Sequence, residues 1–233
     1  MTASHGAPSG HGVTRRVPGP RSTGRPSAAE SIATVVHARH VEGRRARVLS
    51  RLLSRLIPSN ASVLDVGCGD GRISRSIQDT RPDTALRGVE VLVRDPTWIP
   101  VDPFDGDSLP DPDGSVDAVL LVDVLHHTRD PMVLLREAVR VARQCVIIKD
   151  HTCDGFLARQ TLAFMDNVGN RRHVVTLPYT YWRRQQWQDA FQALPVEVDR
   201  WHQRLGLYWW PAAIVFERSL HFVARLRRMA DVP

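Results

Sequence analysis

The stretch "VLDVGCGDGRIS", residues 63–74, decides the fold that we predict for this chain. An apolar run ends in the acid Asp65 and leads into three glycines at alternate positions, Gly67, Gly69 and Gly71. Glycines allow a tight turn and let backbone N–H groups approach a ligand, and the N-terminus of a following helix favours negative charge. The stretch therefore predicts a first strand, a ligand-binding loop and a first helix.

Strands and helices alternate from this loop to residue 151. We expect strands at 85–91, 97–104, 115–125 and 145–149, and helices at 72–80 and 131–143. This alternation is typical of a parallel sheet covered on both faces. Ligands of such sheets bind beyond the carboxyl ends of the strands, so the residues that follow each strand are the candidate site.

The composition divides the chain into a tail and one domain. The 233 residues are 42% hydrophobic, which suffices for one well-buried domain. Residues 1–30 hold four arginines among Gly, Pro, Ser and Thr, with too little apolar surface to offset the entropy of ordering. We expect residues 1–30 to be a disordered basic tail and residues 31–233 to be the folded domain.

Charge and cysteine content restrict the partners. The net charge of +6 comes almost wholly from arginine, since Lys149 is the only lysine. A solvated tail explains the basic N-terminal segment better than a nucleic-acid arm, so nucleic acid is not the expected partner. The three cysteines have no CxxC spacing and no His/Cys/Asp/Glu cluster has metal spacing, which predicts a cytoplasmic protein without a metal.

The glycine spacing and two acids indicate the kind of ligand. Dinucleotide sites use G-x-G-x-x-G, but here Arg72 occupies the third glycine position and would obstruct close packing of helix and strand. Asp65 precedes the loop, where it can accept hydrogen bonds from an amine. Glu90 ends the second strand, where a carboxylate can accept both ribose hydroxyls. The pattern indicates a nucleoside with an amine and no pyrophosphate.

With these motifs the chain resembles the class I S-adenosylmethionine-dependent methyltransferases, of the small-molecule type that includes quinone methyltransferases. The matching segments are "VLDVGCGDG", "GVEV", "FDGDSLPDPDGSVDAVLLVDVLHHTRDP" and "VARQCVIIKDH", within residues 45–151. The resemblance implies a single α/β, Rossmann-like, doubly wound and mostly parallel sheet of seven strands. The last strand is antiparallel, and a helical and loop insertion follows strand five.

The resemblance also implies the cofactor, S-adenosylmethionine (AdoMet), and the residues around it. Asp65, Gly67 and Gly69 surround its methionine part, and Glu90 binds its ribose. Asp123, at the end of the fourth strand, borders the sulfonium. The adenine amino group is assigned to Asp105 with the nearby Gly106 N–H, and Asp107 is a competing candidate.

Catalytic candidates follow the fourth and fifth strands. His127 is a candidate base, because histidine titrates near neutral pH, although the pair formed with His126 can also simply shape its loop. Asp150 and His151 are a candidate acid–base pair or, alternatively, the capped end of a strand.

Residues 151–182 are longer than a simple connection and are predicted to be a substrate lid. A mixture of polar and aromatic side chains suits an apolar pocket with a few polar contacts; the candidates are Asp166, Asn170, His173, Tyr179 and Tyr181. The alternative is a structural clasp. In the helix before the glycine loop, His37, His40 and Arg44 share a face that either closes over the cofactor or is solvated.

The sequence thus predicts methyl transfer from AdoMet to an oxygen, nitrogen or carbon nucleophile of a small metabolite. Three alternatives remain: a lipid or quinone methyltransferase at the membrane surface, an AdoMet-binding protein without catalysis, and an RNA methyltransferase that uses the basic tail. The aromatic and arginine residues of 207–228 are typical of an interfacial membrane segment. The alternation in "LHFVARLRR" favours an antiparallel edge strand, so peripheral membrane contact is not the favoured reading.

Overall fold

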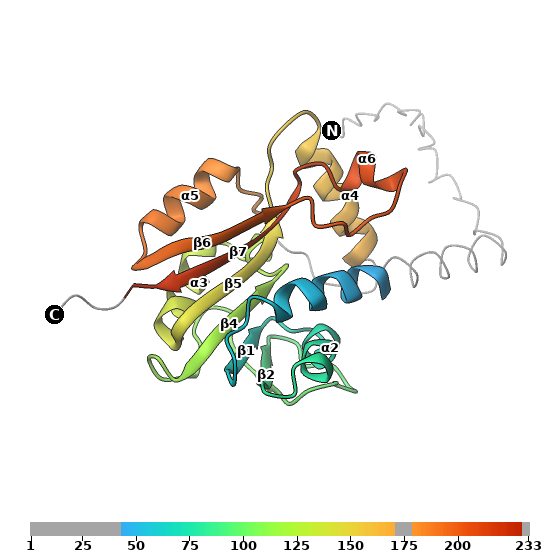
Figure 1. Cartoon of the computed structure of the whole chain (residues 1–233). Helices are drawn as coiled ribbons and strands as arrows, with labels where there is room; N and C mark the ends of the chain where they lie inside the picture. Colours follow the sequence, from blue (N-terminus) through green and yellow to red (C-terminus); the bar gives the residue numbers. More distant parts are fainter. Residues whose placement is uncertain (1–42, 171–178, 230–233) are drawn as a thin grey trace, which may run out of the picture. The chain divides into compact units, whose positions relative to one another are not determined.

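The computed structural model describes residues 43–170 and 179–229. Its centre is a seven-stranded sheet in the order β3-β2-β1-β4-β5-β7-β6 (Figure 1). The first five strands are parallel, and β7 runs antiparallel to both of its neighbours. The strands are β1 (Ser62–Val66), β2 (Ala85–Glu90), β3 (Val101–Pro103), β4 (Val116–Val122), β5 (Ala142–His151), β6 (Val196–Gln203) and β7 (His221–Arg228). The predicted Rossmann-like fold is confirmed.

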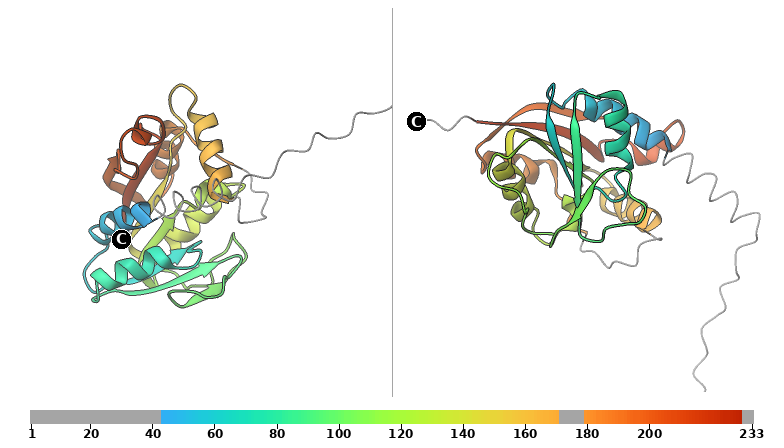
Figure 2. Two further views of the ribbon diagram at one scale, coloured as in Figure 1. Left: turned by 90° about the vertical axis from the view of Figure 1, so that its right-hand side faces the viewer. Right: turned by 90° about the horizontal axis from the view of Figure 1, so that it is seen from below.

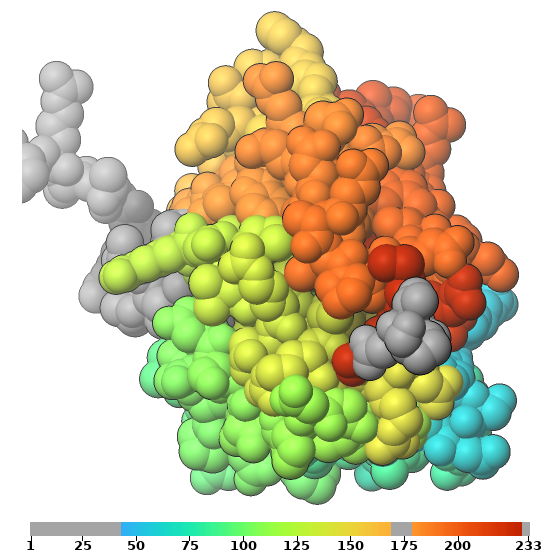
Figure 3. All heavy atoms as spheres, turned by 90° about the vertical axis from the view of Figure 1, so that its left-hand side faces the viewer, coloured from blue at the N-terminus to red at the C-terminus, as the bar shows by residue number. Residues whose placement is uncertain are grey.

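Helices cover both faces of the sheet (Figures 1 and 2). Besides a helix at 43–54 they are α2 (Arg72–Thr80), α3 (Pro131–Val141), α4 (Ala158–Asn170), α5 (Arg184–Gln192) and α6 (Ala212–Phe216), with a 3-10 turn at Leu125–His127. The helix at 43–54 and α2 pack on one face. In the space-filling view of Figure 3, the orange segment of α5 and β6 lies above the yellow-green segment of α3, and these helices cover the other face.

Alternation along β4 builds a separate core on each face. Ala118 and Leu120 pack with the helix at 43–54 and α2, while Val119 and Leu121 pack with α3 and α5. Successive side chains of a strand point to opposite faces, so a central strand buried on both sides is apolar throughout. All four side chains are fully buried. The continuous apolar run that predicted this strand therefore reflects two cores.

Two strand predictions need correction. β7 is not an edge strand, because β6 pairs with its outer side and the described sheet ends at β3 and β6. Its alternation is also weak: Phe222, Val223 and Ala224 are all fully buried, since helices cover both faces here. β5 is longer than predicted and contains Asp150 and His151, which pair with Phe222 and His221 of β7. These two candidates are therefore held inside the sheet and do not follow it.

Candidate cofactor and active site

The loop after β1 has the backbone that the glycine spacing predicted. Gly67, Gly69 and Gly71 have φ angles of 67°, 62° and 77°, in the left-handed region that favours glycine. A Cβ added to Gly67 would lie 2.7 Å from Cγ2 of Val124, and one added to Gly71 would lie 2.5 Å from Cγ1 of Ile99. A side chain is therefore excluded at Gly67 and at Gly71, and Val124 brings the segment after β4 against the loop.

Asp65 lies beneath this loop with one oxygen unused. Its Oδ2 accepts a hydrogen bond of 2.6 Å from the Ser74 hydroxyl, whereas Oδ1 is buried and has no partner among the described residues. Burial raises the pKa of Asp65 to about 7, the Ser74 hydrogen bond opposes the rise, and the charge of Glu90 adds to it. A buried carboxylate oxygen without a donor fits a ligand that brings an ammonium group.

Glu90, at the end of β2, accepts hydrogen bonds from the glycine loop and from the residue that follows β2. Its Oε2 accepts the Gly69 N–H at 2.7 Å, and its Oε1 accepts the Val91 N–H at 2.9 Å. Each carboxylate oxygen has a second lone pair, so Glu90 can hold the loop and still accept hydrogen bonds from a ligand.

The loop after β3 forms the outer rim of this region. The exposed Asp105 accepts the N–H groups of Asp107 and Ser108 through Oδ1, at 2.9 and 2.7 Å. These two hydrogen bonds lower the pKa of Asp105. Gly106 has a φ angle of 95°, and a Cβ added there would lie 3.4 Å from Val91. Asp105 therefore shapes the loop, while Asp107 is exposed.

Asp123 is the centre of a partly buried ion cluster at the end of β4. Its Oδ1 pairs with the Lys149 ammonium and its Oδ2 with the Arg45 guanidinium. Burial by itself raises the pKa of Asp123, but the positive charges of Arg45 and Lys149 outweigh burial and hold the pKa well below its ordinary value. Lys149 is fully buried and also lies 3.4 Å from Nδ1 of His221. The cluster thus holds two cations around one carboxylate.

Asp150 organises a second cluster, inside β5. Its Oδ1 lies 2.7 Å from Nδ1 of His126 and accepts the His151 N–H at 2.7 Å, while its Oδ2 accepts the Leu125 N–H at 3.1 Å. Burial raises the pKa of Asp150, but the positively charged His126 and its hydrogen bond outweigh burial and lower the pKa. The fully buried Asp150 has no exposed oxygen to offer a substrate.

His126 lies between two carboxylates. Its Nδ1 faces Asp150, and its Nε2 is 3.8 Å from Oδ2 of Asp166, an oxygen that also accepts the Tyr181 hydroxyl. Burial lowers the pKa of His126, but the charges of Asp150 and Asp166 outweigh burial and raise the pKa above its ordinary value. The two carboxylates therefore favour the protonated form of His126, which joins α4 to the sheet.

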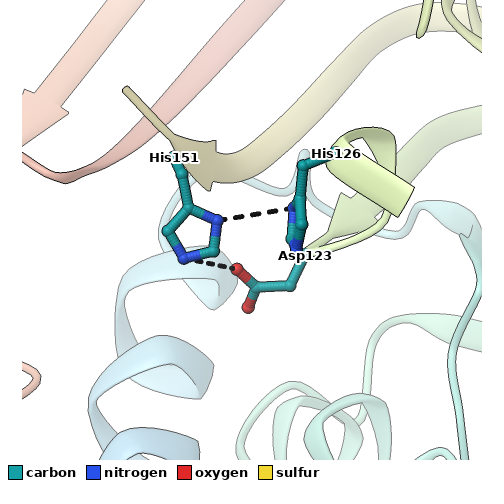
Figure 4. Close-up of side chains that lie close together, drawn as sticks. All are labelled: Asp123, His126 and His151. Atoms are coloured by element: carbon teal, nitrogen blue, oxygen red, sulfur yellow. Dashed lines mark hydrogen bonds and ion pairs between the residues drawn. The ribbon is translucent and has the colours of Figure 1, made fainter. Parts of the chain in front are cut away.

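His151 connects the two clusters (Figure 4). Its Nδ1 lies 3.4 Å from Nδ1 of His126, and its Nε2 lies 3.8 Å from Oδ1 of Asp123. Burial and the positive charges of Lys149 and His126 lower the pKa of His151, so the ring is neutral at neutral pH. Asp123, His126 and His151 offer three atoms within 4.8 Å of one another. Arg45 and Lys149 already supply positive charge there, which disfavours a metal ion.

His127 is more open than these side chains. The residue is half-buried, but its Nδ1 is a buried atom with no hydrogen-bond partner among the residues that the structure describes. Burial and the positive charge of His126 lower the pKa of His127 to about 4, so the imidazole is neutral at pH 7. The ring of Tyr179 lies 6.1 Å away and stacks at 5.9 Å on Tyr181. His127 and the two tyrosines therefore form one aromatic wall beside the end of β4.

The predicted residues fall into three groups. Asp65, Gly67, Gly69 and Glu90 form the loop region, and Asp105 and Gly106 lie at its rim. The catalytic candidates His127, Asp150 and His151 meet Asp123, Asp166, Tyr179 and Tyr181 at the ends of β4 and β5. Asn170 ends α4, while His173, His37 and His40 lie outside the described residues.

Sequence reasoning missed the cations of the site. Arg45, rather than its neighbour Arg44, reaches Asp123, while Arg44 donates to the Gly206 carbonyl at 3.2 Å. The signal for Lys149 was present, because a single lysine among so many arginines, at a strand end, points to a specific place for it. The pattern gave no signal for His221, because its partner Lys149 is 72 residues away along the chain.

Comparison with known proteins agrees with this geometry. The sequence model of a family described as a methyltransferase domain matches residues 35–204. Since this is more than half of the chain, the protein belongs to the methyltransferase domain family. Its cofactor is S-adenosylmethionine, and the unpartnered Asp65 oxygen, the glycine loop and Glu90 fit that group. None of the curated proteins searched matches the chain.

Solved structures share the fold at low sequence identity. One is the methyltransferase in a complex with the Trm112 methyltransferase activator from Haloferax volcanii, with TM-score 0.61 and 16% identity over 88% of this chain and 98% of that chain. A SAM-dependent methyltransferase, possible histamine N-methyltransferase, from Thermotoga maritima has TM-score 0.60 and 16% identity over 84% and 96%. The [4+2]-cyclase SpnF has TM-score 0.57 and 15% identity over 78% and 80%.

Proposed function

We propose that the protein transfers the AdoMet methyl group to an oxygen, nitrogen or carbon nucleophile of a small metabolite. One observation carries this proposal: the glycine loop and the histidine cluster meet at the carboxyl end of the sheet. Val124, which would clash with any side chain at Gly67, lies between Asp123 and the turn that holds His126 and His127. A cofactor site and a set of proton-accepting groups therefore adjoin.

The cofactor roles follow from the free hydrogen-bonding capacity of each side chain. Asp65 receives the methionine ammonium on Oδ1, and Glu90 receives the ribose hydroxyls on its remaining lone pairs. Asp105 and the Gly106 N–H take the adenine amino group and ring, and Asp123 closes the site at the end of β4. AdoMet supplies a methyl group already activated on a sulfonium, so the protein has to orient the acceptor and, where necessary, take up its proton.

His127 is the best-placed proton acceptor. It is neutral at pH 7 and half-buried, and its Nδ1, which is buried, makes no hydrogen bond within the described residues and keeps its lone pair for a proton. His151 is also neutral but only 4% exposed. The oxygens of Asp150 already interact with the His126 ring and accept the N–H groups of His151 and Leu125. We therefore assign Asp150 a positioning role. The wall of the acceptor site is formed by the stacked rings of Tyr179 and Tyr181. Polar contacts come from the Tyr181 hydroxyl and Asp166, as in a pocket that is mainly apolar.

A second candidate function is AdoMet binding without methyl transfer. It is favoured by the burial of most groups that could accept a proton, since Asp150 is fully buried and His126 and His151 are 1% and 4% exposed. The similar structure of SpnF is a [4+2]-cyclase, so this fold also serves other reactions. Another similar structure is a complex with a methyltransferase activator, which makes an activator protein a further candidate partner.

Calorimetric titration with AdoMet and, separately, with NAD tests the cofactor. We expect binding of AdoMet alone. Glu90→Ala should weaken AdoMet binding by about 1.5–3 kcal/mol, the range for hydrogen bonds to a charged group, whereas Glu197→Ala on β6 is the matched control and should bind normally. Equal affinities of these two variants would contradict the role of Glu90.

Labelled-methyl transfer to a panel of hydroxyl, amine and carbon acceptors then separates the two functions. His127→Ala should lower turnover by roughly 10²–10⁴ with AdoMet affinity preserved, as expected for loss of a base. Turnover at the wild-type rate would refute His127 as the base. AdoMet binding with no transfer to any acceptor class would favour the second function.

A further inference from the structure

Large apolar side chains gather on the surface of α4 and of the segment that contains α6. Of the fifteen exposed large apolar residues in the described ranges, eight lie on these two segments. Trp210 is 74% exposed and Phe156 is 83% exposed. Burying side chains of this size lowers the free energy, so their exposure is unfavourable unless they contact a partner. We call this group the apolar cap surface: Phe156, Leu157, Phe164, Val168, Trp209, Trp210, Ile214 and Val215.

The two segments of the apolar cap surface lie side by side, as the views of Figures 1 and 2 agree. Phe164 of α4 stacks on Phe216 of α6 at 6.2 Å between ring centres. Arg218 donates to the Phe156 carbonyl at 3.2 Å and to the Thr161 hydroxyl at 3.0 Å. The exposed side chains thus belong to one surface, and contiguous exposed apolar surface of this kind marks an interaction site.

The charges around this surface have one sign. Arg159, Arg204 and Arg218 are exposed. The acids of the same segments turn inward: Asp166 accepts the Tyr181 hydroxyl, and the buried Glu217 accepts the N–H groups of Gly206 and Tyr208. Within residues 156–168 and 204–218, the exposed charges are therefore arginines alone. The partner must combine an apolar interior with negative charge at its boundary.

We propose that the apolar cap surface docks on an anionic lipid bilayer. Tryptophan and phenylalanine favour the boundary between hydrocarbon and headgroups, and arginines beside them are attracted to anionic lipids. No helix of the described ranges is long and apolar enough to cross a membrane. A second copy of the chain is a poorer occupant, because a symmetric contact would bring the same arginines together.

Docking would place the candidate acceptor site at the lipid surface. α4 carries Phe164 and Val168 on its exposed side and Asp166, the partner of Tyr181, on its inner side. The helix that contacts lipid is therefore also a wall of the acceptor site. This step rests on the proposed function, whereas docking itself does not and is measured without AdoMet or acceptor.

Flotation of the full chain with vesicles tests the proposal. The probes are phosphatidylcholine vesicles and vesicles of phosphatidylcholine with phosphatidylglycerol, at low and high salt. We expect flotation with the anionic vesicles and reduced flotation at high salt, because screening weakens the attraction of the arginines. Trp210→Ser with Ile214→Ser should lower the partition coefficient at least about tenfold, given the free energy of burying two large apolar side chains.

The matched control removes two exposed apolar side chains elsewhere, Val133→Ser on α3 and Val198→Ser on β6. Both variants keep the basic residues 1–30, so any contribution of that segment is the same in each. Equal flotation of the two double variants would overturn the proposal. So would concentration-dependent self-association, measured by light scattering, that the Trp210→Ser and Ile214→Ser changes abolish while flotation is unaffected.

Arg159→Gln tests the charge separately. Arg159 is exposed and its side chain makes no hydrogen bond within the described residues, so its replacement should leave the fold intact. It should weaken flotation with anionic vesicles several-fold and leave any weak flotation with phosphatidylcholine unchanged. An equal effect on both vesicle types would overturn the electrostatic part of the proposal.

Discussion

The glycine loop after β1 and the ion clusters at the ends of β4 and β5 lie at the same end of the sheet. They differ in whether their carboxylate oxygens have hydrogen-bond or ion-pair partners. The N–H groups of the loop donate to the Val89 carbonyl and the Glu90 carboxylate, and one buried oxygen of Asp65 has no donor among the described residues. In the ion clusters, Asp123 pairs with two cations and Asp150 accepts three N–H groups. The loop therefore has free hydrogen-bonding capacity for a ligand, whereas both oxygens of Asp123 and of Asp150 have partners that hold His126 and His151 in position.

Removing the central carboxylate should produce the largest effect on stability. Asp123→Asn leaves the fully buried Lys149 without its carboxylate and should lower the free energy of unfolding by about 3–5 kcal/mol, as when one partner of a buried ion pair is lost. Asparagine tolerates the φ angle of 58° at this position, so the backbone adds little to the loss. Urea unfolding monitored by circular dichroism measures the change.

Two variants sharpen this measurement. Glu197→Gln breaks the exposed pair with Arg227 and should cost less than about 1 kcal/mol. Adding Lys149→Met to Asp123→Asn should restore a substantial part of the stability, because the unpaired buried charge is removed. A loss below 1 kcal/mol for Asp123→Asn alone would show that Lys149 is not held by this charge.

Asp65→Asn should act in the opposite direction. The pKa of Asp65 is about 7 in the folded protein and about 4 in an unfolded chain, so the folded state binds more protons between these values and stability falls as the pH rises through them. The substitution removes this loss and should stabilise the protein at pH 8 by roughly 1–4 kcal/mol, with little effect at pH 4. The same variant should bind AdoMet more weakly in calorimetry.

A gain in stability together with a loss of affinity is the signature of a binding group that is unpaired without its ligand. If Asp65→Asn instead lowers stability at pH 8, the carboxylate has a donor within the protein. The Asp65 Oδ1 would then not be free to bind the ammonium group of the ligand.

Gly71→Ala tests whether the loop needs glycine for packing as well as for backbone freedom. Gly206 is the control, since its φ angle of 74° matches the 77° of Gly71 but no atom lies within 4 Å of an added Cβ. Both substitutions carry left-handed strain of roughly 1–2 kcal/mol. Gly71→Ala should cost roughly 1–3 kcal/mol more, because its Cβ would meet Ile99. Equal thermal unfolding of both variants would leave backbone freedom as the only reason for this glycine.

The two regions also differ in how far the sequence predicted them. Local patterns encode the glycine loop: glycines at alternate positions, an acid at the end of β1 and Glu90 at the end of β2 were sufficient to predict their proximity. The ion clusters are made by residues far apart in the chain, since 78 residues separate Arg45 from Asp123 and 26 separate Lys149 from Asp123. The periodicity of a sequence does not predict such long-range ion pairs, because they depend on the order of the strands and the packing of the helices.

Sheet order also explains the wrong prediction for β7. Alternation in "LHFVARLRR" suggested an edge strand, but β6 pairs with its outer side, so β7 lies between β5 and β6, two strands that precede it in the chain. Asp150 and His151 were expected after the fifth strand, yet β7 extends the pairing of β5 through them. Their burial, and thus the positioning role of Asp150, follows from a long-range strand that the local pattern did not reveal.

The pH dependence of the His126 contribution is the smallest effect and the most specific test of the second cluster. Burial lowers the pKa of His126 but the charges of Asp150 and Asp166 outweigh it, so the folded pKa lies above the ordinary 6.5. The contribution to stability is therefore fully present below pH 6.5 and is lost as the pH rises through the folded pKa. The difference in unfolding free energy between the wild type and His126→Asn should be larger at pH 6 than at pH 9, by on the order of 1 kcal/mol. His202→Asn on the edge strand β6 is the matched control, and a difference for His126→Asn that stays constant with pH, or grows towards pH 9, would show that Asp150 and Asp166 do not hold His126 as a cation.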